Sequence, residues 1–200
     1  MKIVTVVAYT ILLIVMLVIT GCYPKFKEVE LDNIPFKTLN DDGIVDLNLI
    51  IENSSILVSR WLSDTQYSFI AYYGKCQNMP RLEGEFRVLF VEVREQENWK
   101  GQPQVIFADV LIHTNSQMAD IRIYDVTDSY PNTNTKLPVT DIQFREVISV
   151  AIEYLKTLGI NDCEVGITQM EETWSVLCKE SECDFDIDAN SLEVIVEGRD

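Results

Sequence analysis

The clearest hydrophobic pattern of the chain lies between residues 140 and 159. Apolar residues recur there at the i, i+3, i+4, i+7 spacing of an amphipathic helix. They are Phe144, Val147, Ile148, Ala151, Ile152, Leu155 and Leu158. Thr140 and Gln143 have the spacing of a capping box, and Gly159 stands where such a helix would end. The pattern therefore predicts a helix over this segment.

A second helical pattern covers residues 44–63. Its apolar members are Leu47, Ile50, Ile51, Leu57, Val58, Trp61 and Leu62. The polar stretch at residues 53–55 favours turns and competes with helix formation, so a break there is the alternative to one continuous amphipathic helix.

Between these segments the pattern changes to short runs rich in aromatic and β-branched residues, which are typical of strands. The runs are YSFIAYY, EFRVLFVEV, QVIFADVLIH and ADIRIYDV. Polar or Gly/Pro-containing segments of hairpin length separate them, so neighbouring strands are expected to pair antiparallel in a meander. The stretch TDSYPNTNTKLP then indicates a long loop and a seam between two subdomains.

The second half continues with four further strand patterns after the helix. They are EVGITQM, TWSVLCK, DFDID and LEVIVEG. This order, with TWSVLCK leading to DFDIDANSLEVIV, resembles PepSY-type and related cystatin-like modules over about 60 residues. The last hairpin of that family carries an acidic residue, a turn with Gly and a β-branched strand; residues 188–194 match this loosely and lack the Gly. The resemblance implies a helix lying across an antiparallel sheet, in a module that acts by contact as a binder or inhibitor.

The amino-terminal segment has a different composition. Lys2 precedes an apolar run from Ile3 to Ile19, and Thr20-Gly21-Cys22 follows. An early positive charge, an apolar core and small residues before the break are the marks of a secretory signal peptide. The alternative is a plain membrane helix, but the run is slightly shorter than the roughly 20 residues that cross a bilayer, and the positive-inside bias is weak.

Residues 18–22 resemble the lipobox of bacterial lipoproteins. The resemblance implies cleavage before Cys22, acylation of its thiol and of the new amino terminus, and anchoring in the lipid bilayer. Tyr23 stands where an Asp would signal retention in the inner membrane, so the implied location is the outer membrane of a bacterial cell envelope, facing the periplasm. Three acyl chains hold far more tightly than one, since each buried methylene contributes about 0.8 kcal/mol.

These patterns divide the chain into four parts. Residues 1–21 are the predicted signal peptide, and residues 22–43, which mix prolines, charges and turn formers, are a predicted lipidated tether. Residues 44–130 form a helix plus a β-meander, and residues 138–200 form the PepSY-like subdomain. The expected fold class is α+β, with antiparallel meander sheet(s) packed by one or two amphipathic helices.

The charge balance bears on the partner. The chain has 16 basic and 32 acidic residues, a net charge of −16, and removal of residues 1–21 leaves 15 basic against 32 acidic residues. Such a field repels nucleic acid and would speed the encounter with a basic protein, although it could serve solubility alone.

Four cysteines remain if Cys22 is lipidated, an even number for an oxidising compartment. Strand alternation and a turn at residues 180–181 would place Cys178 opposite Cys183, close enough for a disulfide in a non-hydrogen-bonded pair. Cys76 and Cys163 would then link the two halves of the chain. The alternative is that all four are buried reduced thiols. The chain has no CxxC and no Cys/His cluster, so neither a redox motif nor a zinc site is expected.

An acidic ladder follows Cys178. Its members are Glu180, Glu182, Asp184, Asp186 and Asp188. Alternation places the last three on the solvated face of a strand, as a candidate docking surface for a basic partner or as a plain solvated face. Asp186, Asp188, Asn190 and Glu197 also have the spacing of a calcium loop. Ser191 stands where that loop needs Gly and the flanks are strands, so no metal site is expected.

Candidates for catalysis are few. The chain lacks GxSxG, P-loop and HExxH motifs, and its single histidine, His113, ends an apolar strand. The sequence therefore predicts a protein that is not an enzyme, needs no cofactor, and acts by protein–protein binding, for instance as an inhibitor or immunity protein against a basic envelope-targeted partner. The alternatives are an assembly lipoprotein of an envelope complex and, least favoured, a hydrolase.

Overall fold

The computed structural model describes residues 26–63, 66–97, 103–127, 141–170, 172–179 and 183–195. The predicted signal peptide, Cys22, most of the predicted 127–138 loop and the capping residue Thr140 lie outside these ranges, as do Glu180 and Glu182 of the acidic ladder. The predictions made for those residues stay predictions.

The described elements follow the chain as β1 (Val29–Pro35), α2 (Leu47–Val58), β2 (Gln66–Lys75), the 3₁₀ helix η1 (Cys76–Arg81), β3 (Gly84–Glu97), β4 (Pro103–His113), β5 (Met118–Asp125), α3 (Asp141–Thr157), β6 (Glu164–Gln169), β7 (Thr173–Cys178), β8 (Cys183–Asp188) and β9 (Val194–Ile195). The strands form one nine-stranded sheet in the order β1-β5-β4-β3-β2-β6-β7-β8-β9. Every strand pair is antiparallel. The α+β class and the antiparallel meander of β2 to β5 are thus confirmed.

Both helical patterns form helices. The 53–55 segment does not break α2; Ser54 is fully buried in it, and the Asn53 side chain donates to the Lys37 carbonyl at 2.9 Å. The helix is shorter than the predicted 44–63 because Asp46 caps it, accepting from the backbone amides of the second and third helical residues. Helix α3 ends as expected, before Gly159, which adopts the left-handed φ of +74°.

Part of the predicted tether is a strand instead. Residues 29–35 form β1, which pairs with β5 at one end of the sheet, and Leu39 makes an isolated bridge with Val45. The sequence of β1 does not show the apolar alternation of a strand, because only Val29 and Ile34 are half-buried and the other five residues are exposed. The expectation of a tether across residues 22–43 is therefore wrong for this stretch.

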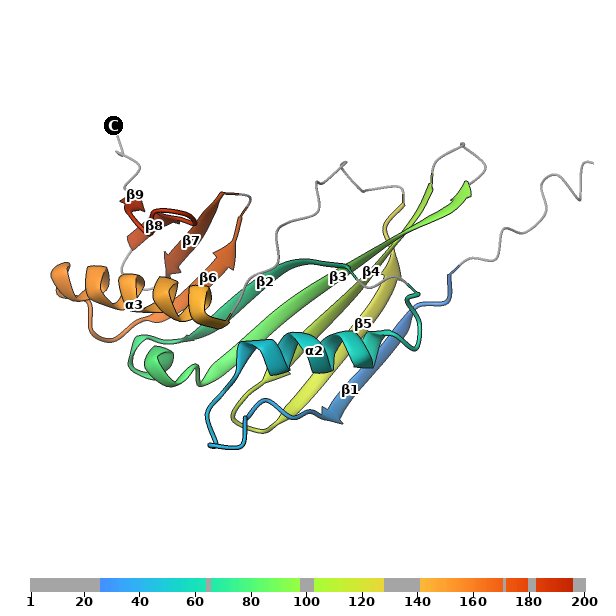
Figure 1. The fold of residues 1–200 in the computed structure, drawn as a ribbon, viewed down its shortest axis with the longest axis horizontal. Coiled ribbons are helices and arrows are strands. Elements are labelled where there is room, and N and C mark those ends of the chain that lie inside the picture. The colour runs from blue at the N-terminus through green and yellow to red at the C-terminus, as the bar shows by residue number, and fades with distance from the viewer. Residues whose placement is uncertain are drawn as a thin grey trace, which may run out of the picture.

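The two halves of the chain repeat one arrangement. In each half a helix precedes four meandering strands, α2 before β2–β5 and α3 before β6–β9, and the first strands of the two meanders, β2 and β6, pair with each other. The two helices lie on the same side of the sheet (Figure 1). The strand order is consequently a palindrome about the β2–β6 seam, with β1 added at one end.

The halves share one hydrophobic core. Phe144 of α3 lies 6.4 Å from Tyr72 of β2 and 5.8 Å from Phe86 of β3, between ring centroids, and 5.4 Å from Trp174 of β7. All four side chains are buried. One aromatic residue thus contacts strands on both sides of the seam, so the seam is not a boundary between two separate cores.

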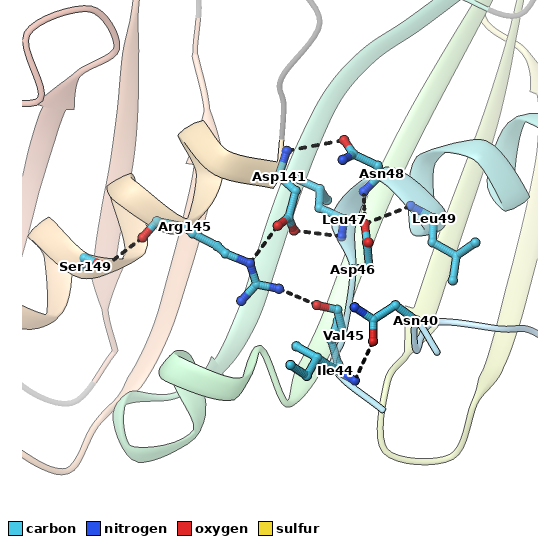
Figure 2. A network of polar contacts seen from close by, with 10 residues as sticks. All are labelled: Asn40, Ile44, Val45, Asp46, Leu47, Asn48, Leu49, Asp141, Arg145 and Ser149. Atoms are coloured by element: carbon cyan, nitrogen blue, oxygen red, sulfur yellow. Dashed lines mark hydrogen bonds and ion pairs between the residues drawn. The ribbon is translucent and has the colours of Figure 1, made fainter. Parts of the chain in front are cut away.

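A polar network also joins the amino-terminal ends of the two helices (Figure 2). Asp141 Oδ1 accepts from the backbone amide of Leu47 at 3.0 Å, and Asn48 Oδ1 accepts from the backbone amide of Asp141 at 3.3 Å. Arg145 Nε donates to Asp141 Oδ2 at 2.7 Å, and the same guanidinium donates to the Val45 carbonyl. Each helix start thereby supplies hydrogen-bonding partners to the other.

Candidate functional site

The face of the sheet opposite α2 and α3 carries the candidate site. We call it the open face. Its side chains come from alternate positions of each strand, and the register aligns one row across five strands. That row runs Leu177, Gly166, Tyr73, Glu85 and His113. Leu177 and Tyr73 are 49% and 40% exposed, so two large apolar side chains of this row meet the solvent.

Tyr73 and Leu177 are brought together by a glycine. Tyr73, Gly166 and Leu177 are consecutive in the row, and a Cβ built on Gly166 would lie 3.3 Å from the Tyr73 ring. The tyrosine ring thus lies against the bare backbone at Gly166. An apolar spot therefore bridges the β2–β6 seam on the open face.

Three carboxylates lie around this spot, together with the basic side chains of Lys75, Lys179 and Arg87. Glu85 lies beside Tyr73 in the row, Asp184 lies beside Leu177, and Glu164 lies two residues before Gly166 at the start of β6. All three are exposed. Glu164 accepts from Lys179 Nζ at 3.1 Å, a contact between two exposed side chains that contributes little stability.

An ion pair stands further along the same face. The guanidinium of Arg87 on β3 donates two hydrogen bonds to the carboxylate of Asp109 on β4, with Nε 2.9 Å from Oδ1 and NH2 2.6 Å from Oδ2. The hydrogen bond that Arg87 donates to Asp109 raises the Arg87 pKa above its usual range, against an opposing effect of burial. Burial, and then the Asp109 charge, raise the pKa of nearby Tyr124. Arg87 and Asp109 thus link β3 to β4 on the open face.

His113 lies between two carboxylates. Its Nδ1 is 3.1 Å from Glu85 Oε1 and its Nε2 is 3.3 Å from Asp120 Oδ2. The backbone amide of Asn33, more than any other group, lowers the pKa of Asp120, and hydrogen bonding to His113 adds to the effect. Both imidazole nitrogens are thus directed at carboxylates, and Ser116 Oγ contacts the His113 carbonyl rather than the ring. His113 thus links β3, β4 and β5 through its two side-chain contacts.

A depression of about 560 Å³ lies where the row ends at the edge of the face. It is bounded by the carboxyl end of β2, the start of β3, the end of β4 and the start of β6. Its lining residues include Tyr73, Lys75, Glu83, Glu85, His113 and Glu164. Three carboxylates against one lysine and the histidine make this a setting for a positively charged side chain.

The acidic ladder is confirmed in placement for its described members. Asp184 and Asp186 project from the open face of β8, while Phe185 and Ile187 are buried on the other. Asp188 has a local role instead: its Oδ1 accepts from the backbone amides of Asn190 at 2.9 Å and Ser191 at 2.7 Å. These two bonds lower its pKa and shape the turn before β9.

The residues with calcium-loop spacing thus include a turn in which Asp188 accepts hydrogen bonds from the backbone of the next residues. Glu197 lies outside the described residues. Within the described ranges, no three His, Cys, Asp or Glu side chains are grouped so that they could hold a metal ion.

The pairing of the cysteines was predicted in part. Cys178 and Cys183 are register partners, as expected, and a disulfide joins Cys76 to Cys163 across the seam. The expected non-hydrogen-bonded class of the Cys178–Cys183 pair is wrong. Glu172 O accepts from Ala189 N, so every second residue of β7 from Glu172 onward, Cys178 included, directs its backbone polar groups toward β8. Cβ atoms are further apart in this class of pair, which disfavours a disulfide there.

Three site residues were not predicted from the sequence: Tyr73, Leu177 and Glu85. Each belongs to a strand that was correctly predicted from its own alternation. Tyr73 and Leu177 lie near each other only because β2 pairs with β6, and these strands are about 90 residues apart in sequence. The signal that was available is the alternation itself, which separates these positions from the core positions of the same strands.

Searches with protein-family models, against curated proteins and against solved structures find no match to the chain. None of the helices in the described ranges has both the length and the apolar character of a membrane span.

Proposed function

We propose that this protein is an envelope-anchored lipoprotein that binds a basic protein through its open face. The observation that carries the proposal is the exposed pair Tyr73 and Leu177, surrounded by Glu85, Glu164 and Asp184. An aromatic anchor inside a polar rim is the usual anatomy of a protein interface. The net charge of −16 favours a partner of positive charge.

The expected binding mode has two components. The acidic field steers the partner toward the protein and is weakened by salt, whereas the contact with Tyr73 and Leu177 forms after encounter and slows dissociation. A basic toxin or enzyme delivered into the envelope is the class of partner that fits, and its neutralisation would be the activity.

The test is photocross-linking in cells that make the protein. A photoreactive residue at Ser175, half-buried on the open face, is compared with one at Glu153, exposed on α3. We expect a cross-linked basic protein from position 175 and none from position 153. Equal adducts from both positions, or adducts at 175 with acidic proteins only, would contradict the proposal and favour an assembly role.

The captured partner then allows an affinity comparison. Leu177→Ser removes the apolar contact on the open face, and Ile142→Ser is its matched control, because Ile142 is 70% exposed on α3. Binding should weaken for the first variant alone. Asp186→Lys should slow association at low salt more than Glu153→Lys does, and the difference should shrink at high salt.

The anchor is tested separately. Cells fed labelled palmitate should incorporate the label into the chain, and Cys22→Ser should abolish incorporation while leaving the protein in the membrane fraction unprocessed. Labelling that persists in Cys22→Ser would refute lipidation at this residue without bearing on the open face.

A further inference from the structure

The four cysteines that the structure describes gather at one end of the sheet, although they come from four segments. Cys76 begins η1 directly after β2, Cys163 precedes β6, Cys178 ends β7 and Cys183 begins β8. Cys76 and Cys163 form the disulfide, with a Cα–Cα distance of 5.7 Å. The Sγ of Cys178 lies 3.7 Å from the Sγ of Cys163, and Cys183 faces Cys178 across the hairpin.

This placement brings a thiol within van der Waals distance of a disulfide sulfur. Two sulfur atoms are in contact near this separation, and such a contact is the first requirement of thiol–disulfide exchange. Cys163 and Cys178 are 2% and 3% exposed, so external thiols have poor access to them, while Cys76 and Cys183 at the two ends are half-buried. Exchange inside the protein is thereby favoured over exchange with a reagent in solution.

We propose that Cys178 is the exchange partner of the Cys76–Cys163 disulfide, and that the two pairings form a switch at the β2–β6 seam. In the step, Cys178 loses its proton and its thiolate attacks the Sγ of Cys163. The Cys163–Cys178 bond forms, the Cys76–Cys163 bond breaks, and the Cys76 thiolate leaves and takes up a proton. No electron enters or leaves, so the exchange needs no external oxidant or reductant.

The consequence lies at the seam and at the depression. The Cys76–Cys163 disulfide links residues 87 apart, across the two halves, whereas Cys163–Cys178 links residues only 15 apart within the β6–β7 hairpin. Exchange therefore removes the covalent tie between the halves. The immediate neighbours of the tie, Lys75 and Glu164, are register partners and line the depression. The pairing state thus sets how firmly this edge of the open face is held.

The test traps the leaving group. Full-length protein, purified without reductant, is incubated with N-ethylmaleimide under native conditions, digested without reduction and analysed by mass spectrometry. We expect slow alkylation of Cys76 that rises together with a Cys163–Cys178 linked peptide. Both signals should be lost in Cys178→Ala and retained in Cys183→Ala, which is the matched control.

A second variant keeps the proposal falsifiable if Cys178→Ala fails to fold. Cys76→Ser, placed in oxidised glutathione, should form the Cys163–Cys178 disulfide in place of the original one. Three results would overturn the proposal: Cys76 that stays unalkylated in the wild type, Cys76 that is alkylated equally in Cys178→Ala, or Cys163 and Cys178 that stay thiols in Cys76→Ser. Purified protein in which Cys178 and Cys183 are already disulfide-bonded to each other would overturn it as well.

Discussion

Asp141→Ala should destabilise the protein more than any other single change at the helix junction. The carboxylate accepts from the amide of Leu47, the first residue of α2, and from Arg145 on the next turn of α3. Its removal leaves the amide of a fully buried residue without its acceptor, a loss of about 1–3 kcal/mol. It also removes a favourable negative charge from two helix starts, which contributes about 0.3–1 kcal/mol at a surface site.

The ion pair with Arg145 adds less. The side chains of Arg145 and Asp141 are 34% and 17% exposed, so solvent screens the pair and its contribution stays at or below about 1 kcal/mol. Arg145 also keeps its hydrogen bond to the Val45 carbonyl. Together these effects give an expected loss of about 2–4 kcal/mol in the free energy of unfolding for Asp141→Ala.

Two comparison variants separate the causes. Asp141→Asn keeps an oxygen that can accept from Leu47 and loses the charge, so we expect about 1 kcal/mol. Glu146→Ala, at an exposed position of the same helix, should change stability by under about 0.5 kcal/mol. The assay is urea unfolding followed by tryptophan fluorescence, to which the buried Trp174 contributes. Equal midpoints for Asp141→Ala and Glu146→Ala would refute the assignment of this network as a joint between the halves.

Two further changes test the packing of β3. Glu92 is 4% exposed, and burial would raise its pKa, but hydrogen bonds from Ser63 and Arg94 outweigh burial and lower it below 4.5. The ionised carboxylate therefore contributes fully to the free energy of unfolding above pH 4.5, and this contribution is lost as the pH falls through the lower pKa of the folded protein. Glu92→Gln should accordingly cost about 1–3 kcal/mol at pH 7 and less at pH 3. A difference that is independent of pH, measured by urea unfolding, would contradict this. Gly84→Ala should destabilise by about 1–3 kcal/mol, because its Cβ would lie 2.3 Å from the Tyr73 carbonyl oxygen; unchanged thermal unfolding would show that the backbone relaxes freely.

Local pattern was sufficient for most elements of the fold. The helices and the strands β2 to β8 each carry their own apolar periodicity, so their existence followed from neighbours in the sequence. β1 was missed because it is a strand at the end of the sheet, with two half-buried and five exposed residues and therefore no apolar alternation. Its backbone hydrogen bonds come from its pairing with β5. β1 could be identified as a strand only from its pairing with β5.

The candidate site was less predictable, for a related reason. Alternation placed Asp184 and Asp186 on a solvated face, and the structure confirms that face. The same rule could not show that Tyr73 would lie beside Leu177, because this depends on which meander edges meet. The Cys178–Cys183 register was predicted, but its hydrogen-bonding class depends on the parity of a hairpin whose turn can be closed in either way.

The seam between the halves connects these observations. The ladder of β2 with β6 has five residue pairs, whereas that of β2 with β3 has eight, so backbone pairing alone holds β2 less strongly to β6 than to β3. Three other links reinforce it: Phe144 in the core, Asp141 between the helix starts, and the Cys76–Cys163 disulfide at the far end of β2. The row on the open face crosses this same seam between Tyr73 and Gly166. Weakening a seam link should therefore lower affinity for a partner that contacts both Tyr73 and Leu177, even when the variant residue lies on the opposite side of the sheet. Asp141→Asn, with a small cost in stability and no exposure on the open face, is the variant in which that coupling can be measured.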